Sequence, residues 1–322
     1  MLIGSNNKLN NRILFLLLPR LILNKSLQRA LVVFIVCVLI CVGFVAASMQ
    51  NSVFLLGFPG IAVCVAFAFV IQWLVYIPSF IKQTERYYDL TGSGTFVVVT
   101  CIALFAAYQY PPIIYGQSAL SWYKIMLGAM VIIWALRLGI FLFSRIHQDG
   151  KDDRFDSIKP DMYRFWVTWT IQGLWVILSA GAALTAILST QNPSIGIVAI
   201  IGLCIWAFGF AIEVIADRQK RAFKRRSERY QGLPFITTGL WAYSRHPNYF
   251  GEIMLWFGVA IAALPALSGW QYVALVSPIF VTVLLVKISG VPLLEAKADK
   301  KWSNLAEYEG YKKNTPVLIP FL

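Results

Sequence analysis

The sequence predicts an all-α fold, a polytopic membrane helical bundle of about eight transmembrane helices, within a range of about seven to nine. Of the 322 residues, 58% are hydrophobic and 13% are charged, and the mean hydropathy is +0.68. Between clusters of charge lie apolar runs of about 20 residues, enough for a helix to cross a hydrocarbon core of roughly 30 Å. These runs lack the alternation of an outer-membrane barrel, so helices must satisfy their backbone hydrogen bonds in lipid.

The apolar runs follow one another along most of the chain, and each is expected to form one span. They lie near residues 30–48, 55–81, 94–113, 120–144, 165–189, 194–216, 249–268 and 270–287. We expect a single membrane domain over 30–322, preceded by a basic cytosolic segment, 1–29. That segment is expected to precede a signal anchor, because no convincing cleavage site follows a short apolar region; an organelle transit peptide is the alternative.

The positive charges predict the orientation of the chain. If the spans alternate in direction, all of the 28 Lys and Arg residues except Lys124 fall at one membrane face, and the connections at the other face carry no charge. The positive-inside rule makes the charged face cytosolic and places both termini there. It also accounts for the net charge of +13 without a nucleic-acid partner. The membrane is either a bacterial inner membrane or an endomembrane like the endoplasmic reticulum.

Several common kinds of site are absent from the sequence. The chain has two histidines, and its five cysteines all lie in predicted spans without zinc-ribbon or CxxC spacing. We therefore expect no metal site. There is no GxGxxG, Walker or GxSxG motif. Any nucleotide site must be built from the ends of membrane helices.

Acidic residues within spans are costly and are therefore candidates for function. Glu213 lies in the sixth span, Asp217 follows four residues later on the same helix face, and Glu252 lies one turn into the seventh span. The alternative is that these acids pair with neighbouring Lys and Arg residues at the level of the lipid headgroups.

The densest polar pattern is the segment 239–252, which reads GLWAYSRHPNYFGE. Pro247 suits the first turn of a helix, so the seventh span is expected to begin there. Arg245 and His246 then stand beside its N-terminus. A helix N-terminus attracts anions, above all phosphate, so the sequence predicts an anion site at this point.

Two features around this helix start favour a polyanionic cofactor such as a dinucleotide. Asn248, Glu252 and Trp256 recur every four residues and form one helix face. The preceding loop carries a run of cations: Arg218, Lys220, Arg221, Lys224, Arg225, Arg226 and Arg229. The alternatives are a polar first turn with a packing tryptophan, and a loop whose basic residues reflect only the positive-inside rule.

These residues resemble a known superfamily, the membrane-embedded NADPH-dependent lipid and steroid reductases, which include steroid 5α-reductases and the C14 and C7 sterol reductases. The chain looks similar to a branch of mostly uncharacterised members with the steroid 5α-reductase C-terminal domain. The matching elements, from about residue 85 onward, are 134–139 (WALRLG), 150–155 (GKDDRF), 166–175, 213–224, 239–258, 290–295 (GVPLLE) and 308–311 (YEGY). The Arg-His-Pro-Asn-Tyr part is the most specific, and isoprenylcysteine carboxyl methyltransferases share it.

The resemblance implies a helical bundle that holds NADPH in a cavity open to the cytosol and receives a hydrophobic substrate from the bilayer. The residues expected to bind the cofactor are Asp217, Lys224, Arg245, His246, Asn248, Tyr249, Glu252 and Trp256. The resemblance implies five of them: Asp217 and Lys224 match a cofactor-binding acid and base, and Asn248, Glu252 and Trp256 match positions that line the cofactor. Glu213 stands where the steroid enzymes have an asparagine.

The resemblance also implies transfer of a hydride to the β-carbon of an enone-like C=C bond, with a proton or carbonyl polarisation from a tyrosine or an acid. The steroid enzymes use a Gln-Glu pair and a tyrosine in early helices, for which the counterparts here are Tyr88-Asp89 and Trp134. A tryptophan cannot deliver a proton as a tyrosine can. We therefore expect Tyr88 or Asp89 to be the catalytic donor, with Tyr87 and Glu85 as rivals. A juxtamembrane polar loop without a chemical role is the alternative.

Three functions remain open. The leading prediction is an NAD(P)H-dependent oxidoreductase acting on a C=C bond of a membrane-soluble lipid, such as a steroid, an isoprenoid or an unsaturated acyl chain. The first alternative is an S-adenosylmethionine-dependent methyltransferase, although its sulfonium cofactor does not require so many cations. The second is a transporter or scaffold, although no clear internal repeat is visible. The expected partners are the bilayer and a hydrophobic small molecule, with the oligomeric state left open.

Overall fold

The computed structural model describes residues 25–109, 120–149, 152–227 and 232–320. Within these ranges, eight helices are long and apolar enough to cross a membrane. The predicted all-α polytopic membrane fold is confirmed. Residues 1–24 of the predicted basic segment 1–29 lie outside the described residues. Residues 25–29 form the start of helix α2 rather than part of a separate segment.

The spans lie close to the predicted positions. The first seven are α2 (Lys25–Ser48), α3 (Gly60–Ile81), α4 (Tyr88–Gln109), α5 (Trp122–Asp149), α6 (Met162–Leu188), α7 (Ile197–Ser227) and α8 (Pro247–Ala263). The eighth is a composite of η4 (Gly269–Leu275), α9 (Val276–Val283), the π-helical η5 (Leu284–Ile288) and α10 (Val291–Trp302). The remaining elements are β1 (Phe54–Leu55), β2 (Phe58–Pro59), η1 (Asp153–Phe155), η2 (Gly239–Ala242), η3 (Leu264–Ala266) and α11 (Ala306–Asn314).

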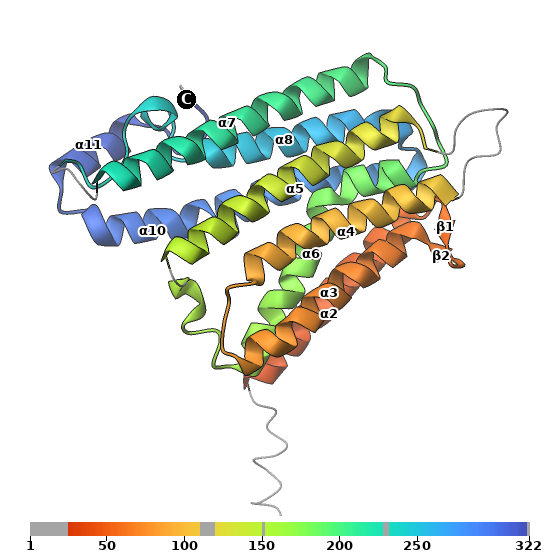
Figure 1. Cartoon of the computed structure of the whole chain (residues 1–322), viewed down its shortest axis with the longest axis horizontal. Coiled ribbons are helices and arrows are strands. Elements are labelled where there is room, and N and C mark those ends of the chain that lie inside the picture. The colour runs from red at the N-terminus through yellow and green to blue at the C-terminus, as the bar shows by residue number, and fades with distance from the viewer. Residues whose placement is uncertain (1–24, 110–119, 150–151, 228–231, 321–322) are drawn as a thin grey trace, which may run out of the picture.

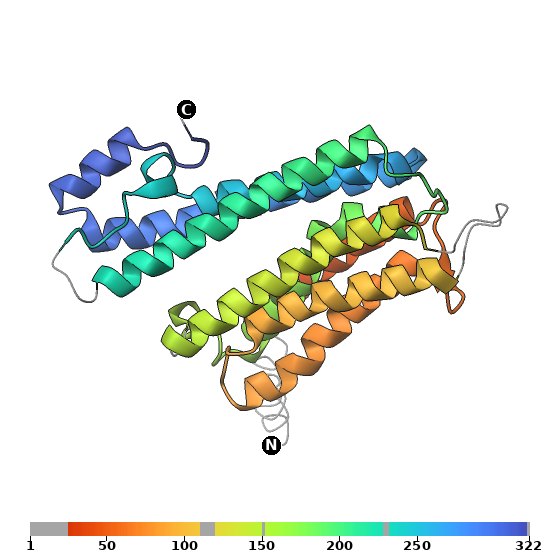
Figure 2. The same ribbon diagram turned by 45° about the horizontal axis from the view of Figure 1, so that its top comes forward.

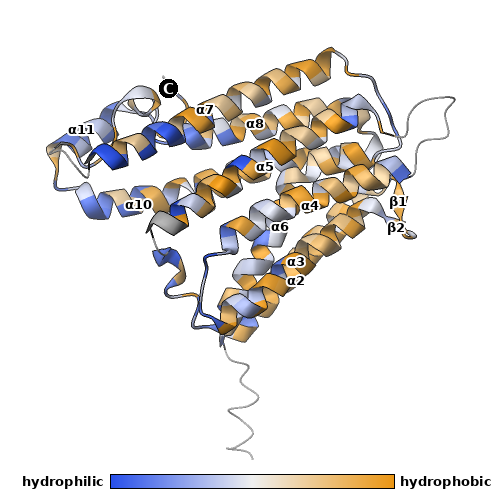
Figure 3. Cartoon of the chain, in the orientation of Figure 1, coloured by the Kyte–Doolittle hydropathy of each residue, from blue (hydrophilic) through white to orange (hydrophobic). Residues whose placement is uncertain are grey.

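The long helices form one bundle, in which consecutive spans run in opposite directions (Figure 1). The hairpin of β1 and β2 lies at one end of the bundle, and α10 and α11 lie at the other (Figure 1, Figure 2). Hydrophobic residues run along the helices, whereas hydrophilic residues gather mainly at the end that carries α11 and η1 (Figure 3). This polarity is expected for a bundle whose charge lies mainly at one membrane face.

Helix α6 occupies the centre of the bundle. In its most apolar window 89% of the residues are buried inside the protein, and α2, α3, α4, α5, α8 and α9 all pack against it. Small residues permit this crowding. A Cβ at Gly181 would lie 2.8 Å from the Phe44 ring of α2, and one at Gly173 would lie 3.2 Å from the Phe69 ring of α3.

Helices α7 and α8 form the closest pair in the protein, and glycines make it possible. A Cβ at Gly209 would lie 2.6 Å from the backbone oxygen of Gly251, and a Cβ at Gly251 would lie 2.6 Å from the oxygen of Gly209. Gly202 and Gly258 meet in the same reciprocal way two turns away, with Cβ-to-oxygen distances of 2.6 Å and 2.7 Å. The antiparallel pair therefore brings the last turns of α7 beside the first turns of α8.

Two predicted boundaries were wrong. The sixth span was expected to end near residue 216, but α7 continues to Ser227, because its basic last turns interact favourably with the helix dipole. The eighth span was expected as one helix over 270–287. It starts instead with a 3₁₀ segment behind a capping box formed by Ser268 and Gln271, and it changes to a π-helix before α10.

Lys124 was the cation that did not fit the charge asymmetry, and the structure accounts for it locally. Its side chain is fully buried, and Nζ donates a hydrogen bond of 2.8 Å to the backbone oxygen of Ser189. Ser189 caps the C-terminus of α6. A cation at this point interacts favourably with the negative end of the helix dipole, so Lys124 serves the fold rather than the orientation.

Candidate functional site

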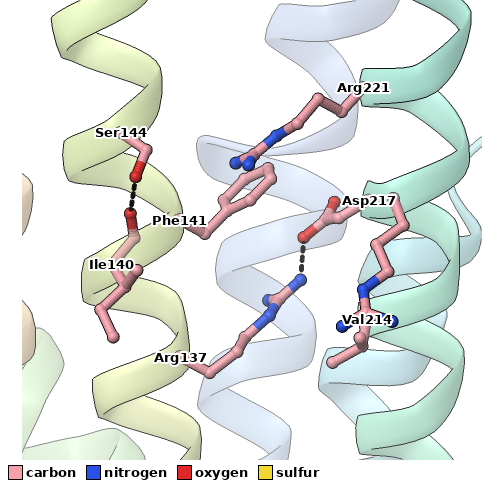
Figure 4. Close-up of a pocket in the computed structure, with 8 residues that line it drawn as sticks. Arg137, Ile140, Phe141, Ser144, Val214, Asp217 and Arg221 are labelled. Carbon is pink, nitrogen blue, oxygen red and sulfur yellow. Dashed lines mark hydrogen bonds and ion pairs between the residues drawn. The ribbon is translucent and has the colours of Figure 1, made fainter.

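A buried ionic cluster joins α5 to α7. The guanidinium of Arg137 on α5 donates hydrogen bonds to the carboxylates of both Glu213 and Asp217 on α7. Glu213 is 3% exposed and Asp217 is 7% exposed. The indole N–H of Trp134, one turn before Arg137, donates to Glu213 Oε2 at 3.1 Å. Figure 4 shows the contact between Arg137 and Asp217 at the edge of a cavity. The two acids predicted from the sequence are therefore fixed by partners from α5.

A third acid faces this cluster from α8. Glu252 is half-buried, and the charges of Glu213, Asp217 and Arg137 all act on it. The crossing of α7 and α8 at Gly209 and Gly251 causes this approach, since Glu252 directly follows one of the two glycines. The cluster thus combines three carboxyl groups with one guanidinium, and its carboxylate oxygens can accept hydrogen bonds from hydroxyl or amide groups of a ligand.

The predicted polar face of α8 does point inward. Asn248 Oδ1 and Trp256 Nε1 are both buried and have no hydrogen-bond partner among the described residues. Buried polar atoms are paired in most native structures, so an unpaired acceptor and an unpaired donor on one helix face are groups that a polar ligand would satisfy. Gln172 of α6 shows a similar pattern. Its Nε2 donates to the backbone oxygen of Tyr88 at 3.0 Å, while its Oε1 is buried without a partner.

Aromatic rings surround the inner end of this face. The ring of Trp256 lies edge-on to that of Trp134 at a centroid distance of 4.8 Å and 5.9 Å from Phe96. Trp175 contacts Phe96 at 4.8 Å. Trp134 and Trp256 are essentially fully buried. Aromatic rings packed edge-on in this way keep water away from the inner end of the polar face.

Arg245 and His246 have a protein partner that the sequence did not suggest. Both bind the carboxylate of Glu295 on α10, Arg245 through its guanidinium at 2.5 Å and His246 through Nε2 at 2.7 Å. The backbone N–H of Arg245 also donates to the oxygen of Pro316 at 2.9 Å. Helix α8 starts at Pro247, as predicted. Arg245 and His246 therefore fasten the first turn of α8 to α10 and to the C-terminal segment.

The other predicted cofactor residues lie at different depths. Tyr249 stacks on the His246 ring at 5.7 Å and lies close enough to Glu252 for an electrostatic interaction. Lys224 lies in the exposed last turn of α7, about two turns beyond Asp217. Arg229 of the predicted basic loop lies outside the described residues. The structure thus brings together the acids and the α8 face, while Lys224 stands apart at the helix end.

The predicted catalytic residues lie at the start of α4. The Tyr88 hydroxyl donates to the backbone oxygen of Thr168 at 3.1 Å, and its ring packs edge-on against Trp169 at 5.1 Å. Asp89 forms an ion pair of 3.5 Å with Arg145, which lies two turns beyond Arg137 on α5. The Tyr88 hydroxyl is thus committed to α6, whereas the Asp89 carboxylate faces the helix that carries the ionic cluster.

The rivals, Tyr87 and Glu85, are placed differently. Tyr87 is 51% exposed. Glu85 is buried, accepts a hydrogen bond from Lys159 Nζ at 2.5 Å and another from the backbone N–H of Asp152 at 2.9 Å. Glu85 therefore anchors the segment around η1 to the start of α4, which is a structural role.

The Glu85 anchor predicts a loss of stability in acid. Burial acts to raise the pKa of Glu85, but the hydrogen bonds from Lys159 and from the Asp152 N–H outweigh it and hold this pKa below its ordinary value. A lowered folded-state pKa stabilises the fold above the ordinary glutamate pKa of about 4.3, and this contribution is lost as the pH falls through the folded-state value. Glu85→Gln should therefore lower the free energy of unfolding at neutral pH by about 2 kcal/mol.

Thermal unfolding in detergent between neutral and acidic pH measures this effect. The difference between wild type and Glu85→Gln should shrink on acidification, because the wild-type carboxylate then becomes protonated. Glu309→Gln, at an exposed site on α11, is the control. A difference between wild type and Glu85→Gln that stays constant with pH would contradict the anchor.

Two residues of the site, Arg137 and Glu295, were not predicted. Arg137 was treated as one of the cytosolic cations although it lies within a span, and the rule that intramembrane charges are functional candidates would have found it. Glu295 lies in the segment 290–295 that carries the family resemblance, but no local pattern marks it as the partner of Arg245 and His246. It meets them only through the return of the chain after α8.

Comparison with known proteins supports the resemblance predicted from the sequence. A family model described as a protein of unknown function (DUF1295) matches residues 72–315, most of the chain. The chain is 29% identical over 121 residues to 3-oxo-5-alpha-steroid 4-dehydrogenase 1 of Mus musculus, covering 38% of this chain and 41% of that protein. It is 31% identical over 123 residues to the Homo sapiens protein of the same name, with the same coverage.

A plant relative gives a similar match. The chain is 30% identical over 122 residues to steroid 5-alpha-reductase DET2 of Solanum lycopersicum, again covering 38% of this chain and 41% of that protein. The chain thus spans about two fifths of the length of these curated relatives. No solved structure matches the chain significantly. The chain belongs to the DUF1295 family and is similar to steroid 5-alpha-reductases over the matched part.

Proposed function

We propose that this protein is an NAD(P)H-dependent reductase of a carbon–carbon double bond in a membrane-soluble, lipid or steroid-like substrate. The similarity to steroid 5-alpha-reductases supports the reaction class. The observation that carries the proposal is the α8 face, where Asn248 Oδ1 and Trp256 Nε1 are buried without partners beside the acidic cluster. Such a face offers both a donor and an acceptor to a polar ligand inside a membrane protein.

The residues present fit a dinucleotide. Its amide and hydroxyl groups have complementary partners in Asn248, Trp256 and the carboxylates of Asp217 and Glu252. Lys224 and the N-terminus of α8 supply positive charge for phosphates at the end of the site. Arg245 and His246 are bound to Glu295, so we assign them the role of holding that N-terminus in place. When bound, NADPH supplies the hydride.

The remaining groups suit a hydrophobic substrate. The edge-on rings of Phe96, Trp134, Trp175 and Trp256 provide an apolar cluster that keeps water from the reacting bond. Between the two predicted proton donors, we favour Asp89, because the Tyr88 hydroxyl already donates to α6. Asp89 must be in its protonated, carboxylic acid form to act as this donor, and its contact with Arg145 holds the side chain toward α5. We place the mouth of the site and both termini on the cytosolic side, where the positive-inside rule puts the basic residues.

Binding of NADPH to purified protein tests this proposal. Asn248→Ala and Glu252→Ala should each weaken NADPH binding by roughly tenfold to a hundredfold, because each removes one or two hydrogen bonds to the ligand. Asn314→Ala and Glu307→Ala, at exposed positions of α11, are the matched controls and should leave binding unchanged. Wild-type protein that does not bind NADPH, or loses no affinity in the two site variants, would end the proposal.

The methyltransferase alternative is tested in the same preparation. A ligand that binds only the folded state raises the unfolding temperature. NADPH, NADH and S-adenosylmethionine are compared at equal concentration. Stabilisation by S-adenosylmethionine and by neither nucleotide would replace the reductase with a methyltransferase.

A further inference from the structure

A cavity of about 370 Å³ opens between α5 and α7, beside the ionic cluster (Figure 4). Its lining residues all belong to these two helices: Arg137, Ile140, Phe141, Ser144, Val214, Asp217, Arg218 and Arg221. Helix α7 packs along α8 and touches α5 over a much shorter stretch. The two lining helices are therefore not sealed against each other here, and the cavity has the size of a small-ligand site.

The charge in this cavity is mainly positive. Three of the lining residues are arginines and one is an acid. The acid, Asp217, is bound by Arg137, so its charge is largely compensated within the wall. Arg218 and Arg221 remain as the cations that can meet a ligand.

Arg221 is held in a position to bind an anion. Its guanidinium lies over the Phe141 ring at 4.7 Å, while Arg137 lies over the same ring at 5.1 Å. One terminal nitrogen of Arg221 is buried and has no hydrogen-bond partner within the described part of the chain. Figure 4 shows the Arg221 side chain reaching across the cavity toward Phe141. A preordered guanidinium with a free N–H suits a phosphate, which accepts forked hydrogen bonds.

The surroundings of the cavity are those of a lipid rather than of water. Ile140 lines the cavity and is 68% exposed, and the neighbouring Leu136 and Ile215 are 51% and 47% exposed. In a membrane-spanning bundle, exposed apolar side chains face acyl chains. The arginines lie toward the basic ends of both helices, at the level where headgroups are expected.

We propose that this cavity binds the phosphate group of an anionic glycerophospholipid, with an acyl chain running over Ile140 toward the middle of the bilayer. Basic pockets between transmembrane helices bind anionic headgroups in this way. The cavity shares Asp217 with the proposed cofactor site, but the lipid proposal does not depend on the reductase function. A soluble nucleotide would present the same phosphate chemistry, but it would leave the apolar wall without a partner.

Native mass spectrometry of the full chain, released from detergent with added phosphatidylglycerol or phosphatidylcholine, tests the proposal. Wild-type protein should retain phosphatidylglycerol in preference to phosphatidylcholine. The double variant Arg218→Gln/Arg221→Gln should bind phosphatidylglycerol roughly tenfold more weakly, and Arg218→Gln by itself roughly fivefold. Arg218 is exposed, so the single variant tests the site even if the double variant folds poorly.

The control is Arg225→Gln/Arg226→Gln, which removes the same charge from the exposed last turn of α7 outside the cavity. Its phosphatidylglycerol binding should remain near that of wild type. Equal losses in the two double variants would show only diffuse attraction and would overturn the proposal. Equal retention of phosphatidylcholine and phosphatidylglycerol by the wild-type protein would also overturn the proposal. Displacement of the lipid by NADPH at concentrations that saturate its own site would assign the cavity to the nucleotide instead.

Discussion

Arg137→Leu is expected to destabilise the protein by about 3–5 kcal/mol, because it leaves two buried carboxylates without their cation. Glu213 and Asp217 both accept hydrogen bonds from this one guanidinium. Their side chains are 4% and 8% exposed, so water cannot replace the lost partner. The variant should also loosen α5 from α7, which otherwise touch over a short stretch. Thermal or denaturant unfolding in detergent, followed by circular dichroism, measures the loss.

A charge-matched comparison separates this effect from the removal of any arginine. Arg86→Leu, at an exposed position between α3 and α4, should change stability little. Replacing Arg137 together with the two acids that it binds, as in Arg137→Leu/Glu213→Gln/Asp217→Asn, should recover much of the loss, since neither acid is then left as a buried charge without its cation. If Arg137→Leu were as stable to unfolding as Arg86→Leu, the ionic cluster would not be a stabilising element.

Gly251→Leu is expected to push α7 and α8 apart. Even a Cβ at this position would lie 2.6 Å from the Gly209 oxygen and 2.7 Å from the Glu213 nitrogen, and backbone atoms cannot rotate away as a flexible side chain can. We expect a loss toward or beyond the upper end of the roughly 1–3 kcal/mol typical of overpacking. Because Glu213 and Glu252 flank this contact, NADPH binding should fall at the same time. Unfolding temperature and NADPH affinity are the two measurements.

Gly43→Leu provides the matched control. Gly43 lies in α2, and a Cβ there would meet nothing within 4 Å. The same substitution should therefore be tolerated, with stability near that of wild type. If both leucine variants behaved alike, the close approach of α7 and α8 would be irrelevant to stability, and the argument for their role in shaping the site would fail.

The sequence was sufficient for the spans and for the inward face of α8. Apolar runs of membrane-spanning length leave the backbone little choice but helix, and the four-residue spacing of Asn248, Glu252 and Trp256 places them on one face. The structure buries Asn248 Oδ1 and Trp256 Nε1 at that face. Local periodicity was enough because both features depend on one helix at a time.

The partners of the charged residues could not be predicted, because they depend on packing between distant helices. Arg137 meets Glu213 across 76 residues of chain, and His246 meets Glu295 across 49. A helix start with adjacent cations suggests an external anion when it is considered in isolation. In the folded protein, the carboxylate of Glu295 on α10 binds the side chains of Arg245 and His246, and α10 begins only after the chain has passed through a π-helix and Gly290.

The enclosure of α6 has a consequence for how the chain is made. Among the described spans α6 is the fifth along the chain, yet α8 and α9, which complete its surroundings, follow it. Ser277 of α9 donates a hydrogen bond to the backbone oxygen of Ser179 in the middle of α6. During insertion into the bilayer, one side of α6 therefore stays uncovered until α8 and α9 have been synthesised. A chain released after α7 would present that unfinished side to the quality-control machinery of the cell.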